Sequence, residues 1–380
     1  MKIDCVELLR LDMPLVTPFR TSFGTQTRRD VLLVRVVADG AEGWGECVAL
    51  ADPLYSSEYT EAAHRALVDQ LLPRLLALPD VTAASVAPAL AAVHGHRMSK
   101  AALETAVLDA QLRSAGMPLA EYLGAVQPSV SSGVSVGIHD SIPELLDAVD
   151  GYLDAGYARI KLKIEPGWDI EPVAAVRDRF GDQTLLQVDA NAAYSRNDLR
   201  TLRVLDRFDL LLIEQPLPEE DIAGHAHLAA AGLQTPICLD ESITSAAVAH
   251  QAITTGACRI VNIKPGRVGG YLEARRIHDV CAAAGVPVWA GGMLETGIGR
   301  AANLALAALP NFTLPSDIAG SDRYFRQDLT DPFTVVDGRI DVPAGRGIGV
   351  TPIPEVLAEL TVRRETVRRA EARAAPVPST

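Results

Sequence analysis

Residues 159–164 read RIKLKI and residues 185–191 read LLQVDAN, with a stretch of helix-like sequence between them. Each of these runs is short and β-rich, and each is followed by Ala-rich helical sequence; the pattern then recurs along the chain. Further runs of this kind lie at Val134–Gly137, Leu210–Gln215, Pro236–Glu241, Arg259–Lys264 and Pro287–Gly291, with a weaker one at Phe312–Leu314. Strands that alternate with helices are typical of a parallel sheet.

The spacing of these runs is regular, because equivalent positions follow one another at intervals of 24 to 26 residues. The positions compared are Gly137, Lys163, Asp189, Glu214, Asp240 and Lys264. A unit of one strand and one helix with so even a length favours a barrel over a doubly wound sheet, whose connections vary more. We therefore predict an α/β fold, a (β/α)7-8 TIM-type barrel, over residues 126–322.

The first 125 residues differ in character. Strand candidates at residues 1–11 and 31–39 precede helical patterns at residues 62–76 and 100–115, which predicts an α+β capping domain over residues 1–125. The loop at residues 17–25 is either a mobile lid or an ordinary hairpin connection.

The end of the chain predicts two further parts. We expect residues 323–362 to form a C-terminal segment that returns to the capping domain. Residues 363–380 contain a charged, helix-like run and end in Pro and Ser, which indicates a flexible tail.

Composition excludes several classes of function. The 380-residue chain has 35 Lys and Arg against 48 Asp and Glu, a formal net charge of −13, which disfavours nucleic acid and anionic membranes as partners. No apolar run is long enough to span a bilayer, and residues 1–4 lead into strand-like sequence rather than a signal peptide, so we expect a cytoplasmic protein. The five cysteines are scattered without a Cys-x-x-Cys pair, which disfavours a disulfide scaffold or a zinc site.

Polar residues close five consecutive strand candidates. In a barrel the active site lies at the carboxyl ends of the strands, so these side chains are placed where chemistry happens. They are Lys161 and Lys163, Asp189 with Asn191, Glu214, Asp240 with Glu241, and Lys264. Any one of them has an ordinary explanation, such as a solvated strand end. Three carboxylates on adjacent strands, flanked on both sides by lysines, are harder to explain without a function.

The three carboxylates Asp189, Glu214 and Asp240 predict a metal site. Hard oxygen ligands suit Mg²⁺ or Mn²⁺, and clustered acids without a cation repel each other strongly. A bound dication stabilises the charge that develops when the weakly acidic proton α to a carboxylate is removed.

The lysines predict an acid/base role. Lys163 is the candidate base, because Lys161 beside it and partial burial favour its neutral form. Lys264 would face the other side of the substrate α-carbon. Two working bases on opposite faces give racemisation or epimerisation, whereas one base with a second, cationic lysine gives elimination; strand position alone leaves both open.

These strand-end motifs resemble those of the muconate-lactonising-enzyme subgroup of the enolase superfamily, over nearly the whole chain. The motifs are Ile160-Lys161-Leu162-Lys163, Val188-Asp189-Ala190-Asn191, Ile213-Glu214-Gln215-Pro216, Leu239-Asp240-Glu241 and Asn262-Ile263-Lys264. The runs GGMLETGIGR at residues 291–300 and LPSD at residues 314–317 are similar to the o-succinylbenzoate synthase and N-acylamino acid racemase family.

The resemblance implies a Mg²⁺ site, which Mn²⁺ or Co²⁺ can also fill, at Asp189, Glu214 and Asp240. It implies Lys163 and Lys264 as the acid/base pair, Lys161 as a further catalytic residue, and Asn191 and Glu241 around the metal ligands. Residues expected to contact the substrate are Phe19, Leu50, Ser135, Gly292, Met293 and Tyr324, with Leu50 standing where family members carry Met. We expect a small-molecule carboxylate substrate and a homo-oligomer.

The implied reactions are the dehydration of succinyl-hydroxycyclohexadiene carboxylate in menaquinone biosynthesis and the racemisation of N-acyl or N-succinyl amino acids, and motifs do not separate the two. Dipeptide epimerisation and muconate cycloisomerisation are alternatives within the subgroup, although residues 291–299 lack a clear acidic motif for a dipeptide amine. A catalytically inactive barrel is a third alternative, and it would predict the loss of a ligand or a base.

Overall fold

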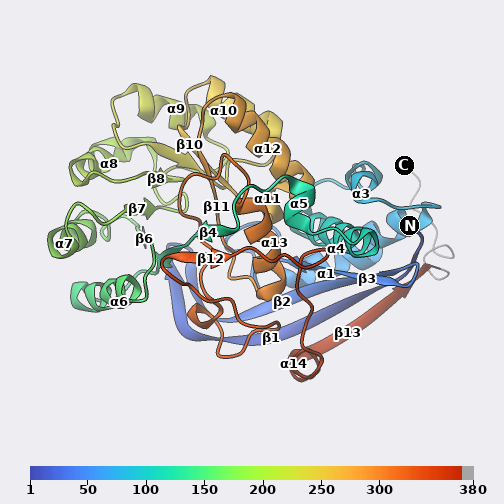
Figure 1. Ribbon diagram of the computed structural model, residues 1–380. Helices are drawn as coiled ribbons and strands as arrows, with labels where there is room; N and C mark the ends of the chain where they lie inside the picture. The colour runs from blue at the N-terminus through green and yellow to red at the C-terminus, as the bar shows by residue number, and fades with distance from the viewer. Residues whose placement is uncertain (370–380) are drawn as a thin grey trace.

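The structure, a computed structural model, describes residues 1–369 and contains two main sheets (Figure 1). The first is antiparallel, with four strands in the order β13-β1-β2-β3. These strands are β1 (Ile3–Thr21), β2 (Gly24–Ala38), β3 (Ala41–Cys47) and β13 (Thr361–Arg368). Between β2 and β3, Asp39 and Gly40 take φ values of 49° and 79°, which match the type I′ turn that Asp-Gly favours.

Helices cover one face of this sheet. They are α1 (Thr60–Ala66), the π-helical turn η1 (Leu67–Leu71), α2 (Leu72–Ala77), α3 (Ala83–Ala89), α4 (Arg97–Ala115) and α5 (Leu119–Leu123). Helix α4 packs closely on β3, because a Cβ at Gly43 or Gly45 would lie 2.1 or 2.0 Å from a carbonyl oxygen of that helix.

The second sheet is parallel, with seven strands in sequential order from β5 to β11. Its strands are β5 (Gly133–Val136), β6 (Arg159–Lys163), β7 (Leu186–Asp189), β8 (Ile213–Glu214), β9 (Ile237–Leu239), β10 (Ile260–Ile263) and β11 (Val288–Ala290). The helices after these strands are α6 (Ile142–Asp154), α7 (Ile170–Phe180), α8 (Leu199–Val204), α9 (Ile222–Ala230), α10 (Ala246–Thr254), α11 (Pro265–Val268), α12 (Tyr271–Ala283) and α13 (Gly297–Ala307), with the 3₁₀ turns η2 (Arg196–Asp198) and η3 (Leu205–Phe208) beside α8. All these strand residues are buried, as expected for a sheet covered on both faces. The predicted barrel-type fold is confirmed.

The weak eighth strand candidate at residues 312–314 does not form a regular strand. Residues 311–317 nevertheless lie between β11 and β5, since Asp317 N donates to Ala290 O at 2.8 Å and Gly133 N donates to Ser316 O at 2.8 Å. Pro310 and Pro315 flank the run and have no N–H to donate, which explains why a regular ladder is absent.

The loop expected at residues 17–25 is mostly paired strand. Phe19 lies opposite Gln26 and Thr21 opposite Gly24, so only a two-residue turn at Ser22 and Phe23 joins β1 to β2. This hairpin end (blue) curves toward the side of the molecule where β6 lies (Figure 1).

The expectation of a helix-like tail from residue 363 is wrong for residues 363–368. They form most of β13, which pairs antiparallel with β1, from Leu11 opposite Thr361 to Cys5 opposite Arg368. The sequence did not predict a strand here because the stretch is highly charged. A strand can carry so many charges because the sheet leaves much of β13 exposed. Residues 370–380 lie outside the described part of the chain.

Residues 323–360 lead back to the first sheet. This part holds β12 (Arg339–Asp341), which pairs with β4 (Ser129–Ser131), and α14 (Pro354–Leu360), which lies against β1; the 3₁₀ turn η4 (Ser321–Arg323) precedes it. Among residues 1–369, no helix is both long enough and apolar enough to cross a membrane.

Candidate active site

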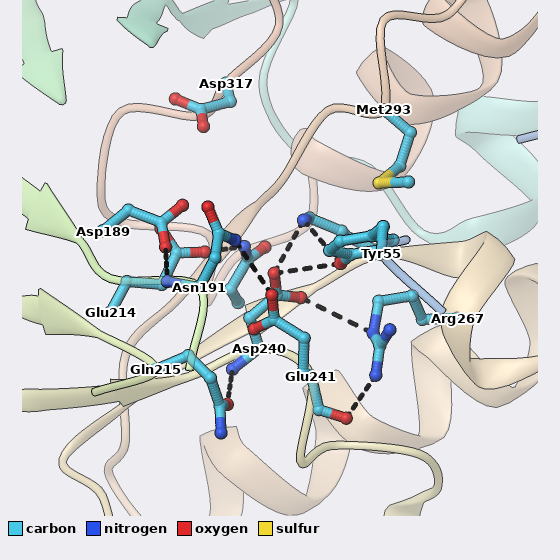
Figure 2. A network of polar contacts seen from close by, with 12 residues as sticks. Tyr55, Asp189, Asn191, Glu214, Gln215, Asp240, Glu241, Arg267, Met293 and Asp317 are labelled. Carbon is cyan, nitrogen blue, oxygen red and sulfur yellow. Dashed lines mark hydrogen bonds and ion pairs between the residues drawn. The ribbon is translucent and has the colours of Figure 1, made fainter. Parts of the chain in front are cut away.

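The strand-end residues predicted from sequence meet at one end of the parallel sheet. The strand register places Lys163 beside Asp189 and Asp189 beside Glu214. Asp240 follows β9 directly and Lys264 follows β10, and all five side chains are at most 8% exposed. Figure 2 shows the three carboxylates turned toward a common space.

Lys161 lies at the centre of this cluster. Its Nζ is 2.9 Å from Glu214 Oε2 and 3.2 Å from Asp189 Oδ2, and it also forms an ion pair with Asp317. The ammonium lies 4.9 Å from the centre of the Trp289 ring. A single cation thus contacts oxygens from strands β7 and β8 at once.

Lys163 also binds Asp189, and it binds Asn191 as well. Its Nζ donates to Asp189 Oδ2 and to Asn191 Oδ1, both at 2.6 Å. Asn191 takes a positive φ of 42°, and its Nδ2 donates to Glu241 Oε1 at 2.9 Å. Asn191 therefore connects Lys163 to Glu241 through two side-chain hydrogen bonds.

Lys264 is bound to a different carboxylate. Its Nζ lies 2.6 Å from Asp240 Oδ2 and 3.1 Å from the Tyr55 hydroxyl, which in turn donates to Asp240 Oδ2 at 3.3 Å. Strands β7, β8 and β9 separate the strands that carry Lys163 and Lys264. The two lysines therefore approach the cluster from opposite sides.

Burial and charge shift several titrations in the cluster. Burial and the Asp189 charge raise the pKa of Glu214 to about 8. Burial would lower the pKa of Lys161, but Asp317, Glu214 and Asp189 outweigh it and raise this pKa well above its usual range. The same balance, dominated by Asp240 on the raising side, raises the pKa of Lys264. Buried acidic and basic side chains therefore set each other's pKa throughout the cluster.

Three residues at the site lie outside the strands of the parallel sheet and were not predicted as site residues. Asp317 contacts Lys161 and Arg159 from the irregular eighth segment, and Tyr55 reaches Lys264 from the first domain. Arg267 lies with its Nε 3.8 Å from Asp240 Oδ1 and donates to the backbone carbonyl of Glu241. Asp317 belongs to the LPSD run at residues 314–317 described above, but spacing did not show where any of these three side chains points.

Three of the predicted substrate-contact residues lie beside the cluster, and a fourth lies on the hairpin end. Ser135 is the register neighbour of Lys161, and its buried Oγ has no hydrogen-bond partner. A Cβ at Gly292 would lie 2.4 Å from Asp317 O. Met293 is 5% exposed and points toward Tyr55 in Figure 2. Phe19, on the curved hairpin end, is buried beside Arg323, whose guanidinium carbon lies 5.7 Å from its ring centre.

The other two also come from outside the parallel sheet. Tyr324 is buried against Arg323, 5.1 Å from its ring centre to the guanidinium carbon. Leu50 lines a separate cavity of about 230 Å³ with Phe23 and Leu54, next to the hairpin end. The first domain thus contributes apolar groups on more than one side of the hairpin end.

The carboxylates fit a divalent cation by their chemistry. Within residues 1–369, no three acidic, histidine or cysteine side chains stand close enough together to hold a metal ion, because lysine ammonium groups lie between the carboxylates. Asp240 Oδ1 is nevertheless buried without a hydrogen-bond partner. Buried carboxylates that already converge on ammonium groups offer the hard oxygen donors that Mg²⁺ and similar ions prefer.

Matches to known proteins agree with this arrangement. Residues 144–356 match the family described as enolase C-terminal domain-like, and residues 6–124 match the mandelate racemase / muconate lactonizing enzyme N-terminal domain. The chain belongs to the enolase superfamily. The N-terminal match covers most of the antiparallel sheet, and the C-terminal match covers strands β6 to β11 of the parallel sheet.

Relatives within this superfamily are enzymes. The chain is 64% identical to an N-succinylamino acid racemase from an Amycolatopsis species, over 96% of this chain and 99% of that protein. It is 47% identical to an o-succinylbenzoate synthase from Geobacillus stearothermophilus, over 91% of this chain and 92% of that one. A solved enolase-superfamily structure from Listeria innocua superposes with a TM-score of 0.92 at 39% identity, covering 97% of this chain and all of that one. The predicted family and fold class are therefore confirmed.

Proposed function

We propose that this enzyme removes the proton α to a carboxylate with the help of a divalent metal ion. The observation that carries the proposal is the pair of buried lysines, Lys163 and Lys264, on opposite sides of three buried carboxylates. A base is needed on each face of an α-carbon to invert it, and the separation of these two lysines by three strands meets that need.

Asp189, Glu214 and Asp240 would hold the metal, with Mg²⁺ as the expected ion and Mn²⁺ or Co²⁺ as substitutes. When bound, the ion stabilises negative charge on the substrate carboxylate as the α proton leaves. The ion would also offset the Asp240 charge that raises the pKa of Lys264.

The residues of the chain perform the proton transfers. In racemisation of an N-succinyl or other N-acyl amino acid, Lys163 takes the α proton from one enantiomer and Lys264 returns a proton to the opposite face; the roles reverse for the other enantiomer. Lys161 stays protonated and balances the charge of the substrate carboxylate, while Asn191 and Glu241 orient the Lys163 side of the site.

The same groups serve the synthase reaction. Lys163 takes the α proton of succinyl-hydroxycyclohexadiene carboxylate and delivers a proton to the departing hydroxyl, which leaves as water. Lys264 then acts only as a cation. We propose both activities for this enzyme, and relatives that carry each activity in their names support this. We also propose a role in menaquinone biosynthesis, a cytoplasmic location and a homo-oligomeric state.

Proton NMR of N-succinyl-L-phenylalanine in deuterated water with Mg²⁺ tests the proposal. We expect the α-hydrogen signal to disappear while the optical rotation falls to zero. Lys163→Ala should lose both changes by at least about 10²- to 10⁴-fold, the usual contribution of a general base, whereas Lys2→Ala, at an exposed position, should match the unmodified enzyme. Full activity of Lys163→Ala would remove Lys163 as the base.

A further inference from the structure

A large cavity opens beside the cluster, at the carboxyl end of β5. Its volume is about 610 Å³, and its lining includes Phe19, Gly137, Ile138, Tyr152 and Arg323. Ile138 is buried and Phe19 is 6% exposed, whereas Asp140 and Glu144 on the rim are exposed. The cavity therefore has buried apolar residues on part of its lining and exposed charged residues on another part.

Arg323 lines this cavity, is partly buried and has no acidic partner among residues 1–369. Its guanidinium carbon lies 5.7, 5.0 and 5.1 Å from the ring centres of Phe19, Tyr152 and Tyr324. One terminal nitrogen donates to Ser135 O at 3.2 Å, and the buried Nε has no partner. Within residues 1–369, no carboxylate lies at ion-pair distance from Arg323, and its other terminal nitrogen donates to the Thr17 hydroxyl at 3.5 Å.

A cation surrounded by rings and lacking an acidic partner is suited to an anionic ligand. Burying a guanidinium is unfavourable unless hydrogen-bond acceptors satisfy its five donors. Aromatic faces stabilise the charge and leave the edge of the guanidinium plane free to bind a carboxylate.

The cavity also lies next to the reacting groups. Ser135 and Val136 pair with Lys161 and Leu162, so Gly137 lies beside Lys163 when the register is continued by one residue. Adjacent strands are about 4.8 Å apart, and the terminal carbons of an extended four-carbon diacid are roughly 4 Å apart. A substrate that places its α-carbon at Lys163 can therefore extend a short acyl chain into this cavity.

We propose that this cavity receives the acyl group of the substrate and that Arg323 binds a carboxylate at the far end of that group. Arg323 is then a specificity-determining residue that selects dicarboxylic over neutral acyl groups. This inference rests on the proton-abstraction function proposed above. The rim acids do not oppose it, because Asp140 already pairs with Arg20 at 3.0 Å and Glu144 is exposed to solvent.

The test compares N-succinyl-L-phenylalanine with its succinamoyl analogue, in which a neutral carboxamide replaces the distal carboxylate. We expect the unmodified enzyme to favour the succinyl substrate in kcat/KM by about 10- to 100-fold, as for a hydrogen-bonded charge pair. Arg323→Met should lose this preference, mainly through KM, and Arg326→Met, at an exposed arginine three residues away, should keep it.

A measurement on the unmodified enzyme guards against a variant that fails to fold. Competitive inhibition by N-succinylglycine should be about tenfold or more stronger than inhibition by N-succinamoylglycine. Equal inhibition, or equal losses of kcat/KM for both acyl groups in Arg323→Met, would overturn the assignment of Arg323.

Two other outcomes are also decisive. In the first, Glu144→Gln changes the preference between N-succinylarginine and N-succinylphenylalanine, whereas Arg323→Met has no effect on acyl preference. The cavity would then bind the amino-acid side chain, and the proposal would be wrong. If the unmodified enzyme exchanges the α-hydrogen of neither acyl derivative, the proton-abstraction function fails and this inference fails with it. Exchange at equal rates overturns Arg323 alone.

Discussion

At the scale of single residues, the site is defined by which carboxylate each lysine contacts. Lys163 and Lys161 share Asp189, whereas Lys264 binds Asp240 and the Tyr55 hydroxyl. The two candidate bases therefore have different environments, and Tyr55 of the first domain contacts Lys264 directly. A reaction that uses both lysines should respond differently to the loss of each.

Lys264→Ala should separate proton removal from inversion. The variant should still exchange the α-hydrogen of the one enantiomer whose proton faces Lys163, but racemisation should fall by about 10²- to 10⁴-fold because no acid remains on the other face. The measurement is deuterium incorporation into each pure enantiomer, read separately by NMR. Equal exchange of both enantiomers by the variant would contradict a two-base mechanism.

Sequence predicted the members of the site that sit on regular strands. Asp189, Glu214 and Asp240 recur at the barrel period, and the carboxyl ends of parallel strands meet at one edge, so their convergence follows from spacing alone. Tyr55 and Asp317 come from irregular segments that contact the lysines through tertiary packing. No periodic pattern fixes the direction of such side chains, which is why sequence did not identify them.

At the scale of elements, β13 shows why a highly charged strand is difficult to predict from sequence. Val367 packs partly buried against the core, whereas Val362 is 64% exposed, although both belong to one strand paired with β1. Glu365 adds a 2.8 Å contact to the buried ring of His64. The last strand of the first sheet is therefore specified by a few inward contacts within a mostly charged sequence.

Substituting each valine by aspartate tests this account of β13. Val367→Asp should lower the free energy of unfolding by roughly 1 to 3 kcal/mol, because it places a charge against the core. Val362→Asp, the matched control, should change it by no more than about 0.5 kcal/mol. Urea denaturation midpoints give both values, and similar losses in the two variants would argue against this pairing of β13.

The contact between Glu104 of α4 and the start of α12 makes a pH-dependent contribution to stability. Glu104, nearly buried on α4, accepts the backbone N–H of Leu272 at 3.1 Å near the start of α12, and burial raises its pKa to about 7 from an ordinary value of 4.5. The folded protein thus binds a proton between these pH values that the unfolded chain does not. The contribution of Glu104 to stability therefore falls as pH rises from about 4.5 to 7, by an amount of the order of 3 kcal/mol.

Glu104→Gln should remove this dependence. We expect the Tm of the variant, relative to the unmodified protein, to rise between pH 5 and pH 8, because the amide never ionises. Glu359→Gln, at an exposed position on α14, should show a constant difference over the same range. Thermal unfolding at a series of pH values makes the comparison, and parallel curves for Glu104→Gln would show that Glu104 does not titrate in this range.

At the scale of the whole molecule, buried polar contacts join the two sheets around the site. Glu46 of β3 accepts the Thr296 N–H at the start of α13 at 3.1 Å, and its pKa is raised to about 7 by burial. Ser22 at the hairpin end donates to Ala190 O, next to Asp189, at 3.4 Å. Tyr55 completes the contact on the Lys264 side. The cluster is therefore enclosed by both parts of the chain, so a ligand bound there should stabilise the molecule as a whole.

Metal binding should consequently raise the temperature of unfolding. A ligand at one hundred times its Kd stabilises the folded state by about 2.7 kcal/mol, and the cation also relieves repulsion among Asp189, Glu214 and Asp240. We expect Mg²⁺ or Mn²⁺ to raise the Tm of the unmodified protein in a concentration-dependent way, and to have little effect on Asp189→Asn or Glu214→Gln. Asp150→Asn, at an exposed position on α6, should respond like the unmodified protein. This measurement also separates an active metal enzyme from an inactive barrel, because its readout is stability. The absence of a Tm shift at millimolar metal would mean that the three carboxylates do not bind the ion. An equal shift in Asp189→Asn would place the ion elsewhere.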